Sequence, residues 1–539
     1  MRKQGLCPGV FPVYSPVMAD SLVRTRSAAL PLVLFIVLAS VVGFYNLGGD
    51  LMNDDEGTYL YSAWRISAGD TPYSDFTLVQ TPLSFLPTAA LFKIVGPSVV
   101  AARALSYLFV LGAALLVFAS ARRFLRTSPW ASAAAAAMFL FTKHIFSLGR
   151  SFMPDDLMLL ATAAALYVFM RADENGKFGA FFAAGALTGA AALAKLNGGL
   201  VLAGFFLYLI WAGWRNRPSI GARIKNGLWI SAGFLLAFGL PFAALLTFVP
   251  GAAFQTVTFH AGKKALAEGS LLFRPFTRLV QFVGNHNYGL VPVAAAGAVF
   301  GRGRSKRKTA LLLFAAAAPF AVLFLPGRFF IRYVVCAMLP LALLFGAGLD
   351  GLVRWKKGRI PALSLAFILI VLCLGPTFQP AKLRTFDRDT RALVAYVQMH
   401  VRPGAFIFGD DPFINYLAQR PCPGRLVDVS EAWTKGGLIT ADDIRRECET
   451  AQTALIFVEK GHSAHHLVGL PDYAKFQAYL DEKYRLDTTM KREFLDVEVY
   501  LRKPGDEPSA RHSPAVLSHE RVRRKLIPGP SPGPQPPSP

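Results

Sequence analysis

The chain has 539 residues, of which 53% are hydrophobic and only 17% are charged, and its formal net charge is +23. Soluble globular proteins average about 25% charged residues. This deficit, together with repeated long apolar runs, excludes an ordinary soluble protein and predicts a multi-pass membrane protein. Nucleic-acid binding explains the net charge poorly, because the basic residues are dispersed over short loops and form no single patch.

The apolar runs predict a membrane domain at residues 21–378, preceded by an N-terminal tail at residues 1–20. About eleven spans are expected, since a bilayer core takes about 20 apolar residues per helix. The spans centre on residues 29–47, 103–121, 130–147, 156–170, 179–194, 199–213, 228–248, 288–300, 309–325, 333–349 and 361–377. No convincing cleavage site follows the first run, so we expect it to be retained.

Lysine and arginine cluster in alternate loops, for example at residues 122–126, 215–225, 302–308 and 354–359. The positive-inside rule places such loops in the cytoplasm. We therefore expect a plasma-membrane (inner-membrane) protein with its N-terminus inside. The acidic first loop and everything after residue 380 would then lie outside.

This sidedness predicts the behaviour of reporter fusions. A reporter that is active only outside the membrane should be active when fused after Lys503 and silent when fused after Arg307, because the two sites fall on opposite faces. Comparing the two fusions at equal expression measures this. The reverse pattern would contradict the topology and every site assignment that depends on it.

The first external loop is acidic although the protein is basic. It contains Asp54, Asp55 and Glu56, which precede Tyr59, Ala63 and Ile66 at helical spacing. We expect a short helix at the membrane surface, ended by Gly69. In the simplest interpretation Asp54 caps the helix and the next two acids favour its dipole. The turn-rich stretch that follows is too apolar to be disordered, and long loops of that kind are usually functional.

Residues 384–503 have the composition of a small soluble α/β domain. Helical periods appear at residues 387–401 and 473–484. Strand-type runs appear at residues 405–410, 425–429, 454–460 and 497–503, which predicts a partly parallel sheet. Cys422 and Cys448 are candidates for a disulfide, although spacing alone does not establish the pairing. Residues 504–539 are rich in proline and serine, and we expect a disordered tail.

Five stretches in this order resemble the GT-C superfamily of membrane glycosyltransferases, which use polyprenyl-phosphate sugars. The closest similarity is to the protein O-mannosyltransferase and aminoarabinose transferase group and to transferases that add sugars to the lipopolysaccharide core. The stretches are "YLYSAWRISAGDTPYSDF" with "TPL", "LGRSFMPDDLMLLATAAALYVF", "ALTGAAALAKLNG", "PGRFFIRYVVCAMLPLAL" and "FGDDPFINYLAQRP". The resemblance covers most of residues 29–503. It implies a GT-C-like helical membrane fold with a small external α/β domain.

The resemblance also implies roles for individual residues. Asp55 would be the catalytic base, Glu56 would support it, and Asp155 would be a further catalytic carboxylate of the second external loop. Lys195 would contact the donor phosphate. The remaining substrate-binding candidates are Asp54, Asp156, Arg150, Arg328 and Arg332.

This chain departs from the aminoarabinose transferases at two places. Thr58 stands where those enzymes carry arginine, and Val79, Gln80, Thr81 and Pro82 stand where they carry Glu-Lys-Pro-Pro. Both differences weigh against aminoarabinose as the sugar and against a bound zinc ion.

The implied chemistry needs one carboxylate as general base for an acceptor hydroxyl and fixed cations for the departing lipid phosphate. Inversion at the anomeric carbon would follow from a single displacement. Asp155 would orient the acceptor or share a divalent cation with Asp55; no other cofactor is expected. Each residue also has a structural interpretation: Lys195, Arg328 and Arg332 could extend to the membrane interface, and Arg150 could pair with Asp155.

The expected partners are a polyprenyl-phosphate-linked sugar donor, an envelope lipid, glycan or protein acceptor, and membrane lipids, with no nucleic acid. The alternative function is a multi-pass transporter or lipid-linked glycan flippase without transferase activity. Transporters place charges in mid-span and often show paired halves. Here the acids cluster in external loops and no repeat is visible.

Overall fold

The computed structural model describes residues 16–48, 55–215, 220–258, 274–284, 290–300, 306–324, 330–354, 386–435, 437–461, 466–492 and 495–505. The chain divides into two compact units, Met1–Arg384 and Thr385–Pro539. The predicted span at 361–377 lies outside the described residues, as do residues 506–539 of the predicted C-terminal tail and residues 1–15 of the N-terminal tail.

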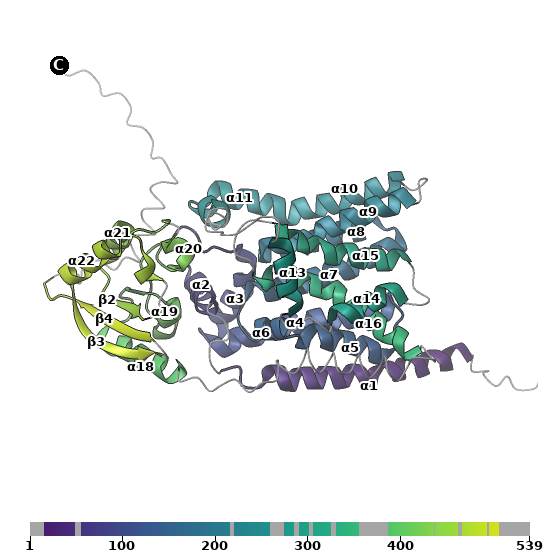
Figure 1. Ribbon diagram of the computed structural model, residues 1–539, viewed down its shortest axis with the longest axis horizontal. Helices are drawn as coiled ribbons and strands as arrows, with labels where there is room; N and C mark the ends of the chain where they lie inside the picture. The colour runs from purple at the N-terminus through teal and green to yellow at the C-terminus, as the bar shows by residue number, and fades with distance from the viewer. Residues whose placement is uncertain are drawn as a thin grey trace, which may run out of the picture. The chain divides into compact units, whose positions relative to one another are not determined.

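The first unit is helical, and its long helices lie side by side (Figure 1). They are α1 (Pro16–Phe44), α2 (Glu56–Ala68), α3 (Phe85–Val95), α4 (Val99–Arg123), α5 (Pro129–Phe141), α6 (Lys143–Gly149), α7 (Pro154–Asn175), α8 (Phe178–Ala194), α9 (Leu200–Arg215), α10 (Ile220–Phe234), α11 (Leu240–Phe248), α13 (Arg274–Gly284), α14 (Leu290–Phe300), α15 (Lys306–Ala317) and α16 (Met338–Arg354). Short 3₁₀ or π segments extend them, among them η1 (Pro82–Ser84), η2 (Leu196–Gly199), η4 (Leu235–Gly239), η5 (Phe254–Thr258), η6 (Ala318–Phe324) and η7 (Ile331–Ala337). Each of the first ten predicted spans falls on these helices.

Length and composition qualify five described helices as membrane-crossing candidates, or six if the bent pair α5 and α6 forms one span. Four shorter apolar helices lie at 29–44, 82–95, 178–194 and 290–299. The expected number of about eleven spans therefore stays a prediction. Large apolar side chains on α1 and α10, such as Val41, Ile224 and Leu228, are exposed, as expected for surfaces that meet lipid.

Helices α8 and α10 cross at glycines. A Cβ added to Gly185 would lie 2.0 Å from the carbonyl oxygen of Ile230, and one added to Gly233 would lie 2.0 Å from that of Phe182. Only glycine allows the two backbones to approach so closely. This contact holds α8 firmly, and Lys195 follows directly at its end.

The second unit contains a four-stranded sheet in the order β1-β2-β4-β3. Its strands are β1 (Ile407–Gly409), β2 (Leu455–Lys460), β3 (Tyr484–Arg492) and β4 (Leu495–Arg502), and its helices are α18 (Phe386–His400), α19 (Pro412–Ala418), α20 (Glu431–Thr434), α21 (Ala441–Ala451) and α22 (Tyr473–Lys483), with the 3₁₀ turn η9 (Leu467–Gly469). Strands β1 and β2 are parallel and the other pairs are antiparallel. The expected partly parallel sheet is confirmed.

Three features of the second unit differ from the sequence predictions. No strand forms at residues 425–429: residues 424–427 form a turn, in which the N–H of Leu426 donates to the carbonyl of Pro423. Strand β3 was not predicted from the sequence, because its side chains are mostly exposed and polar. The structure has Cys422 and Cys448 as buried thiols, so the candidate disulfide is not formed between these two described residues. Burial raises the pKa of the Cys448 thiol to about 12.

Candidate active site

Helix α2 runs from Glu56 to Ala68 and is terminated by Gly69, as expected from its sequence. Gly69 adopts φ +102°, and its N–H reaches the carbonyls of Arg65 and Ile66. The residue at the N-cap is Asp55, so the prediction that Asp54 caps the helix is wrong; Asp54 itself lies outside the described residues. The Asp55 carboxylate makes no capping hydrogen bond. It forms an ion pair with Arg332, which follows the first residue of η7.

Glu56 faces the protein interior, where it meets Arg103 of α4. The Arg103 guanidinium donates from Nε and Nη2 to the two carboxylate oxygens of Glu56, both at 2.7 Å. The N–H of Phe152 donates to the same carboxylate at 2.9 Å, and Arg103 also donates to the carbonyl of Leu47 at 2.8 Å. Glu56 and Arg103 are fully buried. This pair therefore joins the end of α1, the start of α2 and the segment before α7.

A second buried ion pair joins α7 to the end of α8. Lys195 Nζ lies 2.8 and 2.7 Å from the two carboxylate oxygens of Asp155. Arg150 does not form the ion pair with Asp155 that the sequence allowed, because its guanidinium donates to the carbonyls of Tyr45 and Asn46. Asp156 accepts from the N–H of Met153 at 3.2 Å and so caps its own helix.

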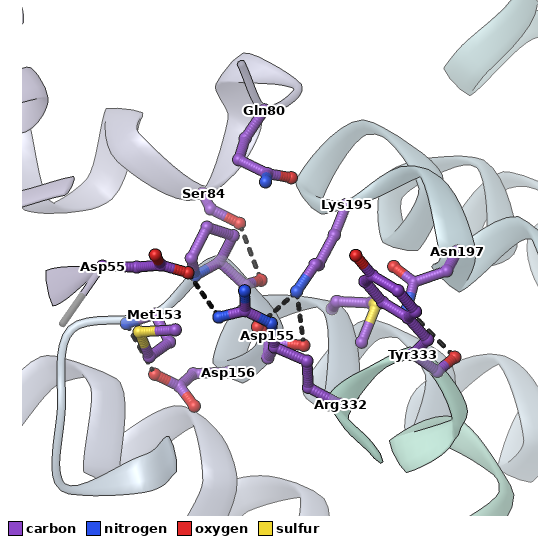
Figure 2. A network of polar contacts seen from close by, with 12 residues as sticks. Asp55, Gln80, Ser84, Met153, Asp155, Asp156, Lys195, Asn197, Arg332 and Tyr333 are labelled. Carbon is purple, nitrogen blue, oxygen red and sulfur yellow. Dashed lines mark hydrogen bonds and ion pairs between the residues drawn. The ribbon is translucent and has the colours of Figure 1, made fainter. Parts of the chain in front are cut away.

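The Asp55–Arg332 and Asp155–Lys195 ion pairs lie side by side (Figure 2). The Arg332 guanidinium points toward Asp55, next to the carboxylate of Asp155 that Lys195 holds. The side chain of Gln80 extends toward this group from the loop between α2 and α3. Arg328, another predicted phosphate contact, lies outside the described residues. The structure thus brings together Asp55, Asp155, Lys195 and Arg332, and it places Glu56, Arg150 and Asp156 in supporting contacts.

The loop between α2 and α3 is held by buried hydrogen bonds. Gln255 accepts from the N–H of Leu78 at 2.8 Å and donates to the carbonyl of Tyr73 at 2.9 Å. The Tyr73 hydroxyl donates to the carbonyl of Gln80 at 2.7 Å. Ser84 is within hydrogen-bonding distance of the carbonyls of Pro154 and Ala194, at 3.0 and 3.1 Å. The loop therefore rests against the residues that precede Asp155 and Lys195.

Replacing Gln255 should loosen this loop. Gln255→Leu leaves the Leu78 N–H and the Tyr73 carbonyl without this buried partner, and we expect a loss of about 2 kcal/mol in the free energy of unfolding. Thermal unfolding in detergent and protease cleavage within residues 69–81 measure the effect. Thr247→Val is the control, because that hydroxyl bonds only within its own helix at an exposed position. Equal stability of both variants would contradict the role of Gln255.

Two acids of this loop, Asp70 and Asp75, have local partners. Burial raises the pKa of Asp70 above its usual range, and the ion pair with Arg65 opposes this shift. Asp75 accepts from the N–H of Thr71 at 2.8 Å and shapes the turn. These two acids thus have local structural roles.

The divalent cation that Asp55 and Asp155 were expected to share stays a prediction. The positive charge that faces these carboxylates comes from Arg332 and Lys195. Among the described residues, no group of three or more His, Cys, Asp or Glu side chains is placed to hold a metal ion.

Two supporting residues were missed from the sequence. Arg103 carries a signal, because a charge at the start of a predicted apolar span is costly unless it has a partner. Gln255 carries none, since a single glutamine in a long loop does not reveal which backbone it reaches. The partners of Arg103 and Gln255 are seen only in the folded structure, where segments that are distant in the sequence pack together.

Residues 79–244 match the family model described as dolichyl-phosphate-mannose-protein mannosyltransferase. The matched range contains Asp155 and Lys195. A comparison with curated protein sequences gives no significant match.

Solved structures resemble most of the chain. The structure of ArnT from Cupriavidus metallidurans bound to undecaprenyl phosphate matches with a TM-score of 0.61 and 16% identity, covering 89% of this chain and 99% of that one. The apo form matches with a TM-score of 0.56 and 17% identity over 89% and 99% of the two chains. The Archaeoglobus fulgidus oligosaccharyltransferase in complex with Zn and sulfate matches with a TM-score of 0.52 and 15% identity over 88% and 74%.

These matches define the fold as ArnT-like and mostly helical. The resemblance to the GT-C superfamily of polyprenyl-phosphate-dependent glycosyltransferases is therefore confirmed. The family model and the shared fold together indicate a membrane-integral glycosyltransferase of the GT-C type.

Proposed function

We propose that this protein transfers a sugar from a polyprenyl-phosphate donor to an acceptor hydroxyl at the outer face of the plasma membrane. The observation that carries the proposal is the partly exposed Asp55–Arg332 pair beside the buried Asp155–Lys195 pair. One cluster thus holds a carboxylate that water reaches and cations that suit a phosphate. The ArnT structure, which shares the fold, is bound to undecaprenyl phosphate.

In the proposed reaction the acceptor oxygen attacks the anomeric carbon of the donor. The bond from that carbon to the phosphate oxygen breaks, and the lipid phosphate leaves with the electron pair. Asp55 takes the proton of the acceptor hydroxyl as general base. A guanidinium suits the leaving phosphate because it can donate two parallel hydrogen bonds. A single displacement of this kind inverts the anomeric configuration.

The two cations of the cluster differ in availability. Lys195 and Asp155 are 6% and 0% exposed, whereas Arg332 and Asp55 are 22% and 40% exposed. Separating a buried pair costs far more than separating one that water reaches. We therefore assign the first phosphate contact to Arg332. Lys195 and Asp155 remain paired and form a fixed side of the site, next to which the sugar phosphate and the acceptor bind.

The proposal is tested by deleting the gene and identifying the lipid-linked sugars that accumulate. The accumulated lipid is then supplied to membranes that contain the protein, and transfer of its sugar to an envelope lipid, glycan or protein is measured. Transfer that depends on the protein supports the proposal. Movement of the lipid across the membrane without transfer would support the transporter or flippase alternative instead.

A further inference from the structure

The Asp55–Arg332 contact joins two groups with different tasks in the proposed reaction. A carboxylate that is to accept a proton works poorly while an arginine neutralises it, because the opposite charge favours its ionised form. An arginine that is to bind phosphate is likewise engaged by the carboxylate. In the present structure the proposed base, Asp55, and the proposed phosphate ligand, Arg332, are therefore paired with each other.

The backbone around Arg332 is anchored, whereas its side chain reaches the surface of the site. Ile331, Val334 and Val335 are buried on either side of it. Asn197 donates to the carbonyl of the next residue, Tyr333, at 3.2 Å. The guanidinium carbon lies 4.9 Å from the centre of the Phe330 ring, which the flat guanidinium can stack upon. A change of partner would then require rotation of the side chain only.

Asp155 does not take part in this exchange. Both of its carboxylate oxygens are held by Lys195 within 2.8 Å, and that pair is buried. Arg332 lies next to this carboxylate (Figure 2). When Arg332 leaves Asp55, the neighbouring carboxylate of Asp155 is already paired with Lys195, so the arginine is directed toward an incoming anion.

We infer that the Asp55–Arg332 ion pair is an autoinhibitory contact that the phosphate of a lipid-linked donor opens. The phosphate draws Arg332 away, and Asp55 becomes available to the acceptor hydroxyl. The donor must then bind before the acceptor is activated. After transfer, departure of the lipid phosphate restores the pair. This inference rests on the proposed function for its role in the cell, but the contact itself is testable by binding alone.

The test is a double-mutant cycle on the purified full-length protein, with undecaprenyl phosphate as the probe and its dissociation constant as the readout. Arg332→Gln should weaken binding about tenfold or more, the loss expected for a charged hydrogen bond. Asp55→Asn should tighten binding about twofold to sixfold, because the competitor for Arg332 is removed. In the Arg332→Gln background, Asp55→Asn should change binding hardly at all.

The cycle separates competition from general charge repulsion. If Asp55 only repels phosphate, Asp55→Asn tightens binding equally with and without Arg332, and the inference is overturned. Unchanged binding in Asp55→Asn would overturn it as well. Asp75→Asn is the matched control, since it removes one negative charge from the same loop and should leave affinity unchanged.

The outcome for this contact is distinguishable from that for the proposed function. Additive effects in the cycle combined with loss of transfer in Asp55→Asn would remove the autoinhibitory contact and keep the transferase. Coupled effects without any transfer would keep the contact and reject the transferase. Thermal unfolding of every variant, measured without the lipid, shows whether a change in affinity comes from misfolding.

Discussion

Asp55→Asn is expected to reduce sugar transfer about 10²–10⁴-fold, the usual loss when a general base is removed. Asparagine has nearly the same size, but it cannot accept the proton of the acceptor hydroxyl. The fold should survive, because the Asp55 carboxylate makes no capping hydrogen bond at the start of α2. The measurement is turnover with a polyprenyl-linked sugar at matched amounts of protein in the membrane.

Asp54→Asn is the control for this variant. It removes the same single negative charge from the neighbouring position. We expect a far smaller loss of turnover than in Asp55→Asn. Near-normal turnover in Asp55→Asn would mean that Asp55 is not the base, and it would return the acidic loop to a structural role. That outcome would also reopen the transporter alternative.

Arg103→Leu is expected to lower the free energy of unfolding by about 3–5 kcal/mol, the range for breaking a buried ion pair from one side. The Glu56 carboxylate would stay buried without the guanidinium that now donates to both of its oxygens. The carbonyl of Leu47 would also lose this donor. Thermal unfolding in detergent measures the loss, and the amount of protein that reaches the membrane gives a second readout.

The double variant Glu56→Leu/Arg103→Leu completes this test. Removing both charges takes away the unpaired buried carboxylate, so part of the lost stability should return. Turnover should stay low, because Glu56 also binds the N–H of Phe152, which precedes Asp155 by three residues. If Arg103→Leu were as stable as the native protein, the pair would not hold together the start of α2 and the segment before α7.

Local sequence determined the elements of this protein. The helical spacing of Tyr59, Ala63 and Ile66 and the glycine at position 69 gave α2 its period and its end, because both depend only on neighbours within a turn or two. The apolar runs located the long helices in the same way. In the second unit the apolar runs at 454–460 and 497–503 located β2 and β4, whereas the polar β3 gave no such signal.

Tertiary structure alone decided the partners within the site. Asp55 and Arg332 are 277 residues apart, Glu56 and Arg103 are 47 apart, and Asp155 and Lys195 are 40 apart. A periodic pattern limits only nearby residues, so it cannot show which carboxylate meets which cation. That choice depends on how closely helices pack, as where Gly185 and Gly233 bring α8 against α10. The sequence thus identified most of the charged residues of the site. The packing of distant helices decided which of them form the partly exposed Asp55–Arg332 pair and which form the buried pairs.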